Sequence, residues 1–231
     1  MSRESKRLNI VCLYCNPKRD GFVHGCLDHI ASRLEARGAD LDRVRLTDFE
    51  ISHCRGCFNC LRTGSCLIKD DMCGIIDRIR KADGMVIGAS VRNGFFPALF
   101  KQFYERITYI LGFGRILEDK YVLAVGAVGF AEGKRQLKRA ITFATFHPHV
   151  TDYLFFRVGV PTRYKVEDAF PVLERASDRL YDLAHAKAPP PWTNRLLRYI
   201  DNYTIRKMML ERDSEGFYDY VKAQWRSKGF L

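Results

Sequence analysis

The sequence predicts an α/β protein built on an open, doubly wound parallel sheet of five strands, with helices on both faces. Short apolar runs typical of buried strands alternate along the chain with segments whose apolar residues recur at helical spacing. Of the 231 residues, 47% are hydrophobic and 13% are aromatic, which is ample for a packed core. Consecutive prolines at 189–191 break the alternation, because proline cannot continue a helix. We therefore expect a core domain over residues 1–187 and a C-terminal helical extension over 188–231.

The first strand and helix open the predicted sheet. The run "LNIVCLY" at 8–14 is almost entirely apolar and is followed by the turn-forming "NPKRDG", which is typical of a buried strand that enters a turn. Apolar residues at helical spacing predict a helix over 22–37, and Gly38 supplies its C-terminal stop. Alternating apolar and polar residues then predict a half-exposed strand over 41–49.

The rest of the core repeats this alternation. Acidic residues in a first turn favour a helix that starts at Asp70, and Pro97 stands at a suitable first helical position. The expected elements are, in order, a helix over 70–83, a strand over 84–90, a helix over 97–111, a strand over 120–130, a helix over 134–146, a strand over 153–160 and a helix over 166–187.

The C-terminal extension is rich in aromatic and charged residues. Its apolar positions form one helical face, made of Leu196, Leu197, Ile200, Tyr203, Met208 and Met209. We expect this face to pack on the core; a second subunit and a bound ligand are the alternatives.

Hydropathy and charge narrow the class of protein. No apolar run reaches the 18 residues of a membrane-spanning helix, and about six apolar residues near the start are too few for a signal peptide. We therefore expect a cytoplasmic protein with no membrane partner. The formal net charge of +11 raises nucleic acid as a partner, but the cations are scattered and no nucleic-acid module is recognisable. An anionic ligand explains the basicity at least as well.

Three loops are the candidate ligand sites, because ligands of open parallel sheets bind beyond the carboxyl ends of the strands. "CNPKRDGF" at 15–22 offers backbone N–H groups, cations and a helix start, which together suit a phosphate. "ASVRNGFF" at 89–96 has a flexible glycine that allows the close approach of a planar ring. "GAVGFAEG" at 126–133 has three glycines but no G-x-G-x-x-G, so it gives no separate dinucleotide signal. Each loop also has a simpler interpretation as a plain connection.

Taken in order, these motifs resemble those of the NADPH-dependent FMN reductase family. The shared order is the strand, loop and helix of 8–37, a cysteine run followed by "DDM" and a helix, and then the 89–96 loop followed by "ALFKQFYER". The resemblance spans about residues 8–160, and the cysteine spacing resembles that of the family's iron-sulfur flavoprotein branch. It implies a flavodoxin-like fold that binds FMN. The ending "YDYVKAQWRSKGF" also looks like the tail of a longer flavodoxin-like oxidoreductase subgroup.

The resemblance also implies which residues hold FMN. Its phosphate would lie on the first loop, mainly on backbone N–H groups, at Asn16, Lys18, Arg19, Asp20, Gly21, Phe22 and Val23. Its isoalloxazine would be flanked by Ala89, Ser90, Val91, Arg92, Asn93 and Gly94, with Gly126 and Gly129 on its other side.

The chain departs from the family's pattern at four of these positions. Asn16 and Val23 stand where hydroxyl residues are usual, and Ser90 and Arg92 replace a proline and a tyrosine. Arg92 would place a cation near the N1 and O2 edge of the flavin and favour its reduced, negatively charged form. An ordinary surface arginine is the alternative.

Four closely spaced cysteines, Cys54, Cys57, Cys60 and Cys66, form the candidate metal site. A compact C-x2-C-x2-C run puts three sulfurs around one small volume, as Fe–S clusters require, and Cys66 closes the site. Structural zinc more often joins two separated pairs, and unligated or redox-active thiols are the third interpretation. We favour a [4Fe-4S] cluster. Because the run follows the second strand, we expect it at the same edge of the sheet as the FMN loops.

Other residues near these motifs receive structural interpretations. Cys12, Cys26 and Cys73 are expected to be small buried hydrophobic residues. His53, beside the cysteine run, is expected to be structural or exposed to solvent rather than catalytic.

Together these features predict an FMN-dependent NAD(P)H oxidoreductase of the iron-sulfur flavoprotein type. It would pass electrons between a nicotinamide or ferredoxin-like donor and a small-molecule or protein acceptor that the sequence does not identify. Hydride transfer needs no acid or base side chain, so no catalytic residue is predicted. The alternatives are an electron carrier or redox sensor with the same cofactors, and a regulatory protein that has lost FMN. The family and the aromatic tail both suggest a homo-oligomer.

Overall fold

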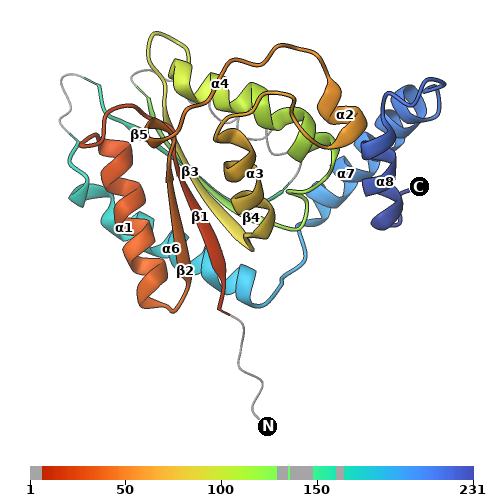
Figure 1. The fold of residues 1–231 in the computed structure, drawn as a ribbon. Coiled ribbons are helices and arrows are strands. Elements are labelled where there is room, and N and C mark those ends of the chain that lie inside the picture. Colours follow the sequence, from red (N-terminus) through yellow and green to blue (C-terminus); the bar gives the residue numbers. More distant parts are fainter. Residues whose placement is uncertain (1–6, 129–134, 136–147, 160–163) are drawn as a thin grey trace.

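The core of the structure is one sheet of five parallel strands (Figure 1). It comes from a computed structural model that describes residues 7–128, 135, 148–159 and 164–231. The strands are β1 (Asn9–Tyr14), β2 (Asp40–Arg45), β3 (Gly84–Ser90), β4 (Tyr121–Val128) and β5 (His149–Arg157). Their order in the sheet is β2-β1-β3-β4-β5, and every neighbouring pair is parallel. The doubly wound α/β fold predicted from the sequence is confirmed.

Helices cover both faces of the sheet (Figure 1). α1 (Phe22–Ala36) and α6 (Phe170–His185) pack on one face, and α3 (Met72–Lys81) and α4 (Ala98–Ile107) pack on the other. α4 continues as a π-helical turn, Thr108–Phe113. No helix in the described part of the chain is long and apolar enough to cross a lipid bilayer.

A glycine lets α1 approach the sheet closely. A Cβ atom on Gly88 of β3 would lie 2.4 Å from Leu27 Cδ1 and 2.7 Å from Val23 Cγ1. Both contacts are far inside van der Waals distance, and Val23 and Leu27 are buried in a packed interior. Gly88 therefore brings the first turn of α1 against the carboxyl end of β3, where two of the predicted FMN loops begin.

Several boundaries differ from those predicted. β2 ends at Arg45, because Leu46–Asp48 forms a 3-10 turn. β5 begins at His149, four residues before the predicted strand. The predicted helix over 134–146 and the end of the strand predicted over 120–130 lie outside the described residues.

One of the three isolated cysteines is not buried. Cys12 and Cys26 lie in the interior as predicted, but Cys73 is exposed. α3 buries its opposite face, through Met72, Ile75, Ile76 and Ile79. Cys73 follows Met72 by one position and so points to solvent, since neighbouring helical residues face different directions.

The C-terminal extension has a small core of its own at one end of the sheet (Figure 1). It consists of α7 (Trp192–Ile205), a π-helical turn (Arg206–Leu210) and α8 (Asp219–Ser227). Leu210, Val221 and Trp225 pack with Leu61 of α2 (Asn59–Thr63), a short helix inside the cysteine run. Trp225 Nε1 also donates to the Phe113 carbonyl at 2.9 Å. The extension therefore supports the cysteine run directly.

The outer face of α7 does not pack as predicted. Leu196, Ile200 and Tyr203 are 50%, 48% and 58% exposed, together with the aromatic side chains of Trp192 and Tyr199. Leu196, Ile200 and Tyr203 of the predicted face are therefore not buried within one chain, and Leu210 and Val221, further along, supply buried contacts.

Candidate functional site

Asn16 joins two of the predicted FMN loops, 15–22 and 89–96. It is 5% exposed, and its Oδ1 atom accepts hydrogen bonds from the Ser90 N–H at 3.0 Å and the Ser90 hydroxyl at 2.9 Å. Below it, the Cys15 N–H donates to the Gly88 carbonyl at 3.0 Å. The two loops are thus locked together at the carboxyl ends of β1 and β3. The carboxamide oxygen of Asn16 is engaged in this lock, so its side chain positions the loops.

His24, which the sequence-based reasoning did not select, supports the same lock. Its Nε2 atom donates to the Asn16 carbonyl at 3.0 Å, and its ring lies edge-on to Tyr14 at 5.0 Å. Burial lowers the pKa of His24, so the ring is neutral at pH 7. A histidine in the first turn of the helix that follows a phosphate-type loop was the available signal.

The first loop ends at the N-terminus of α1. Gly21 occupies the N-cap position, and no side chain among the described residues caps the helix. Val23 is buried and Phe22 packs edge-on against Phe156 at 5.3 Å, so both present only backbone to the loop. Free N–H groups of a first turn, with the positive end of the helix dipole, form an anion site.

The charged residues of the first loop are exposed and already paired. Lys18 Nζ lies 3.8 Å from Asp20 Oδ1, and Arg19 forms an ion pair with Asp48, which follows β2. Exposed pairs of this kind are weak, so a phosphate can compete for both cations. The loop therefore suits an anion through backbone donors first and side-chain cations second.

The 89–96 loop is folded by a tight turn. Arg92 and Phe95 exchange backbone hydrogen bonds of 2.8 and 2.9 Å, and Asn93 and Gly94 have φ values of 51° and 77°. Positive φ at both central residues defines a type I′ turn, for which Asn-Gly is the preferred pair. Arg92, Asn93 and Gly94 are exposed, whereas the Val91 N–H still donates to the Ala127 carbonyl at 2.9 Å and the Val91 side chain is partly buried against the core.

Gly126, from the third predicted loop (126–133), lies beside the 89–96 loop. Gly126 of β4 is paired in register with Ala89 of β3, and both residues are buried. The structure thus brings Asn16, Ala89, Ser90 and Gly126 to one edge of the sheet. Gly129 lies outside the described residues.

The cysteine run has an irregular, tightly turned backbone. Gly56, Phe58 and Gly64 have positive φ values of 63°, 56° and 74°. For Phe58 this conformation is strained, and such strain is held in place by the surroundings. Phe58 packs edge-on against Tyr109 at 5.0 Å and near Phe217 of the extension. Asn59 Nδ2, at the start of α2, donates to Thr63 Oγ1, at its end, at 2.9 Å.

The run does not stay at the edge where the FMN loops lie, which corrects our expectation. Gln102 in the middle of α4 donates to the Ile51 carbonyl, Arg106 one turn later donates to the Ser52 carbonyl, and Phe58 packs on the π-helical turn. α4 leads away from the carboxyl edge, so Arg106 is about 12 Å along the helix axis from Ala98 at 1.5 Å per residue. α2, the short helix inside the run, lies beside the extension (Figure 1), and its Leu61 packs with Val221 and Trp225.

The thiols of the run are free and differ in burial. Cys57 is exposed, whereas Cys54, Cys60 and Cys66 are half-buried, and none of the four is in a disulfide in the described structure. Burial, with the neighbouring thiols, raises the pKa of Cys60 to about 11. Within the described residues, no three His, Cys, Asp or Glu side chains converge on a common point as a metal-binding group. In type and number the four thiols still fit the ligand set of an Fe–S cluster.

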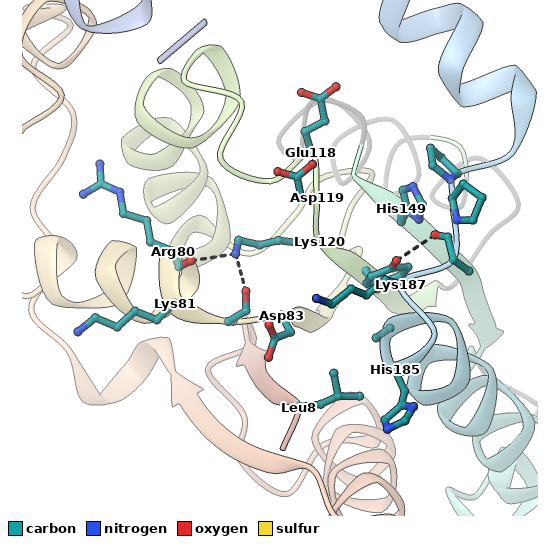
Figure 2. A pocket seen from close by; sticks show the side chains of 16 residues that line it. Leu8, Arg80, Lys81, Asp83, Glu118, Asp119, Lys120, His149, His185 and Lys187 are labelled. Atoms are coloured by element: carbon teal, nitrogen blue, oxygen red, sulfur yellow. Dashed lines mark hydrogen bonds between the residues drawn. The ribbon is translucent and has the colours of Figure 1, made fainter. Parts of the chain in front are cut away.

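A separate cavity of about 800 Å³ opens at the opposite, N-terminal edge of the sheet (Figure 2). Lys120 crosses it and donates to the Arg80 carbonyl at 2.9 Å and to the Ala82 carbonyl, and Tyr121 donates to the Ala188 carbonyl at 2.9 Å. Lys120 thus satisfies the carbonyls at the end of α3. The cavity is not part of the FMN edge.

The strand order and the paired loops at the carboxyl edge define the flavodoxin-like class of α/β proteins. Within this class the chain belongs to the NADPH-dependent FMN reductase family, whose model matches residues 8–155. Among its curated relatives, an iron-sulfur flavoprotein of Clostridioides difficile (strain 630) is 24% identical over 94% of this chain and 96% of its own length. An iron-sulfur flavoprotein of Methanosarcina thermophila is 30% identical over 48% of this chain and 60% of its own length.

Solved structures agree on the fold. An NAD(P)H:quinone oxidoreductase from Methanothermobacter marburgensis superposes with a TM-score of 0.58 at 16% identity, over 77% of this chain and 99% of that chain. A flavone reductase gives the same TM-score at 17% identity, over 78% of this chain and 63% of that chain. The family match makes this chain a flavin-dependent oxidoreductase.

Proposed function

We propose that the chain is an FMN oxidoreductase that takes electrons from NAD(P)H, with a [4Fe-4S] cluster on Cys54, Cys57, Cys60 and Cys66. The single observation that carries the FMN site is the Asn16–Ser90 lock beside the uncapped start of α1. This arrangement presents an anion site and a ring site side by side at one sheet edge. When bound, FMN supplies the exchange between two-electron and one-electron chemistry.

The protein's part in this proposal is to bind and to orient. The N–H groups of residues 18–23 receive the phosphate, with Lys18 and Arg19 adding charge. Ala89 and Ser90 form the floor beside Gly126, and the 92–95 turn stands over the edge where the ring would lie. The side chain of Arg92 is exposed there and is our candidate for tuning the flavin's potential.

The cysteine run is the proposed second cofactor site. Four free thiols in one loop, three of them half-buried and Cys60 packed against the core that α3 and α4 share with the sheet, support a cluster shielded from solvent on one side. Because α4 carries this site away from the FMN edge, electrons would pass between two separated centres, within one chain or between the subunits of a proposed homo-oligomer. The exposed Trp192, Leu196 and Tyr199 of α7 support such an assembly.

Cofactor analysis after anaerobic purification and reconstitution tests this proposal. We expect about one FMN and four iron and four sulfide per chain, as a single [4Fe-4S] cluster requires. Protein with FMN but no iron would remove the cluster, and colourless protein would remove both cofactors. A Cys60→Ser variant should retain FMN and lose iron, whereas Cys73→Ser, an exposed cysteine outside the run, should retain both.

A further inference from the structure

The loop that carries all four cysteines is closed at its base by a buried ion pair. Asp70 Oδ2 accepts a hydrogen bond from the Ser52 N–H at 2.8 Å, which joins the residues on either side of the run. Arg106 Nη1 donates to the Ser52 carbonyl at 2.8 Å and to Asp70 Oδ2 at 2.7 Å, and Nη2 donates to Asp70 Oδ1 at 2.9 Å. One guanidinium therefore holds both ends of the loop.

The Arg106–Asp70 ion pair is buried. The side chains of Arg106 and Asp70 are 1% and 6% exposed. A buried pair is stabilising only when its geometry and its further hydrogen bonds are good, and here the fork of the guanidinium meets the carboxylate with two parallel bonds. Asp70 is also held by the Met72 N–H at 3.2 Å.

One donor of Arg106 is left over. Its Nε atom is buried and has no hydrogen-bond partner among the residues that the structure describes. An unpaired buried donor costs free energy, so such a group in a native protein needs an explanation. The side chain of Cys66, the last cysteine of the run, lies within interaction range of the Arg106 guanidinium.

We propose that Arg106 is a positioning residue of the cysteine site, which closes the loop and uses its remaining N–H and its charge to stabilise the sulfur ligands of a bound cluster, Cys66 first. The inference rests on the proposed function, because it needs the cluster. Cluster sulfurs carry negative charge, and hydrogen bonds and cations near them favour the more negative, reduced form. Arg106 would thereby raise the cluster's reduction potential.

The test compares cluster reduction in Arg106→Gln, Arg106→Lys and wild-type full-length protein, reconstituted without oxygen and titrated by spectroelectrochemistry. At the wild-type midpoint, we expect the ratio of reduced to oxidised cluster to fall about tenfold in Arg106→Gln, which corresponds to about 59 mV for one electron. Arg106→Lys keeps the charge but not the fork, so its fall should be smaller.

Arg115 offers a matched control. It is also a buried arginine, 7% exposed, paired with Glu118 at 3.0 Å and with an Nε atom that lacks a partner in the described structure. It stacks on Trp225 of the extension, away from Ser52 and Asp70. Arg115→Gln should lower the unfolding temperature by a similar amount and leave the cluster potential unchanged.

The outcomes separate this inference from the proposed function. Wild-type protein that holds no iron and sulfide after reconstitution would overturn the cluster, and the role of Arg106 with it. A wild-type cluster whose potential is the same in both Arg106 variants would overturn the role of Arg106 alone. If Arg106→Gln does not fold, Arg106→Lys decides: a lower potential supports the inference and an unchanged one contradicts it. Loss of the cluster in a folded Arg106→Gln, with retention in Arg115→Gln, also supports it.

Discussion

Asn16 illustrates how one buried side chain can hold two loops of a sheet edge together. Its carboxamide oxygen satisfies both the backbone N–H and the hydroxyl of Ser90, so two loops that are 74 residues apart share one geometry. A serine here, as is usual in the family, would be too short for the same reach. Asn16 therefore fixes the 15–22 loop against the 89–96 loop.

Replacement of Asn16 tests this assignment. Asn16→Ala leaves two donors of Ser90 without their acceptor, which should cost about 1–3 kcal/mol of stability. Because the loop loses its anchor, FMN affinity should fall about tenfold, equal to about 1.4 kcal/mol of binding free energy. Asn59→Ala is the control, since it removes a comparable amide from the cysteine run. Equal FMN affinities in both variants, measured by fluorescence titration, would contradict the role of Asn16.

Single residues were also where the sequence was least informative. The type I′ turn could be predicted in part, because Asn-Gly, here Asn93 and Gly94, is the dipeptide preferred in such turns. Arg106 looked like one more cation on an amphipathic helix, because its partners Ser52 and Asp70 are 54 and 36 residues away in the chain. Contacts of that kind depend on how the elements pack, and periodicity carries no information about them.

At the scale of elements, the C-terminal extension is tied down by a polar clamp before α8. Asp213 accepts hydrogen bonds from the Phe217 N–H at 2.9 Å and the Tyr218 N–H at 3.0 Å, and pairs with Lys222 at 2.6 Å. These interactions, Lys222 first, lower the pKa of Asp213 to about 2. We propose that residues 188–231 form an appended unit whose order depends on this clamp.

The clamp predicts a dependence on pH. A carboxyl group whose pKa is depressed on folding stabilises the fold fully above its unfolded value of 3.8, and this contribution is lost as the pH falls towards 2. The environment of Trp225 should therefore loosen between about pH 4 and 2, measured by fluorescence in a Trp192→Phe background that leaves one tryptophan. In Asp213→Asn the part of the transition due to this group should vanish. The same acid transition in both proteins would rule out the clamp.

Elements were predicted well where periodicity was strong and poorly where the backbone is irregular. The buried runs of β1 and β3 and the apolar face of α3 stand out in the sequence. The short helix α2 did not, because five residues with two flanking αL positions leave no helical pattern. The predicted start of β5 was four residues too late, because the apolar and polar residues of this strand do not alternate strictly.

For the whole molecule, the main result is that the two proposed cofactor sites belong to different parts of one fold. The FMN edge is built by the carboxyl ends of β1, β3 and β4, whereas α2, the short helix inside the cysteine run, lies beside the extension (Figure 1). The sequence placed the run after the second strand, but only packing on Arg106, Tyr109 and α8 carries it away from that edge.

The central claim is that the chain is an oxidoreductase reduced by a nicotinamide. The most direct test is an absorption spectrum of the reconstituted protein, recorded without oxygen before and after addition of NADPH or NADH. We expect NADPH or NADH to bleach the flavin absorption bands rapidly in the wild-type protein and more slowly in Asn16→Ala. A spectrum that bleaches only with a reduced protein donor would contradict the claim and identify an electron carrier.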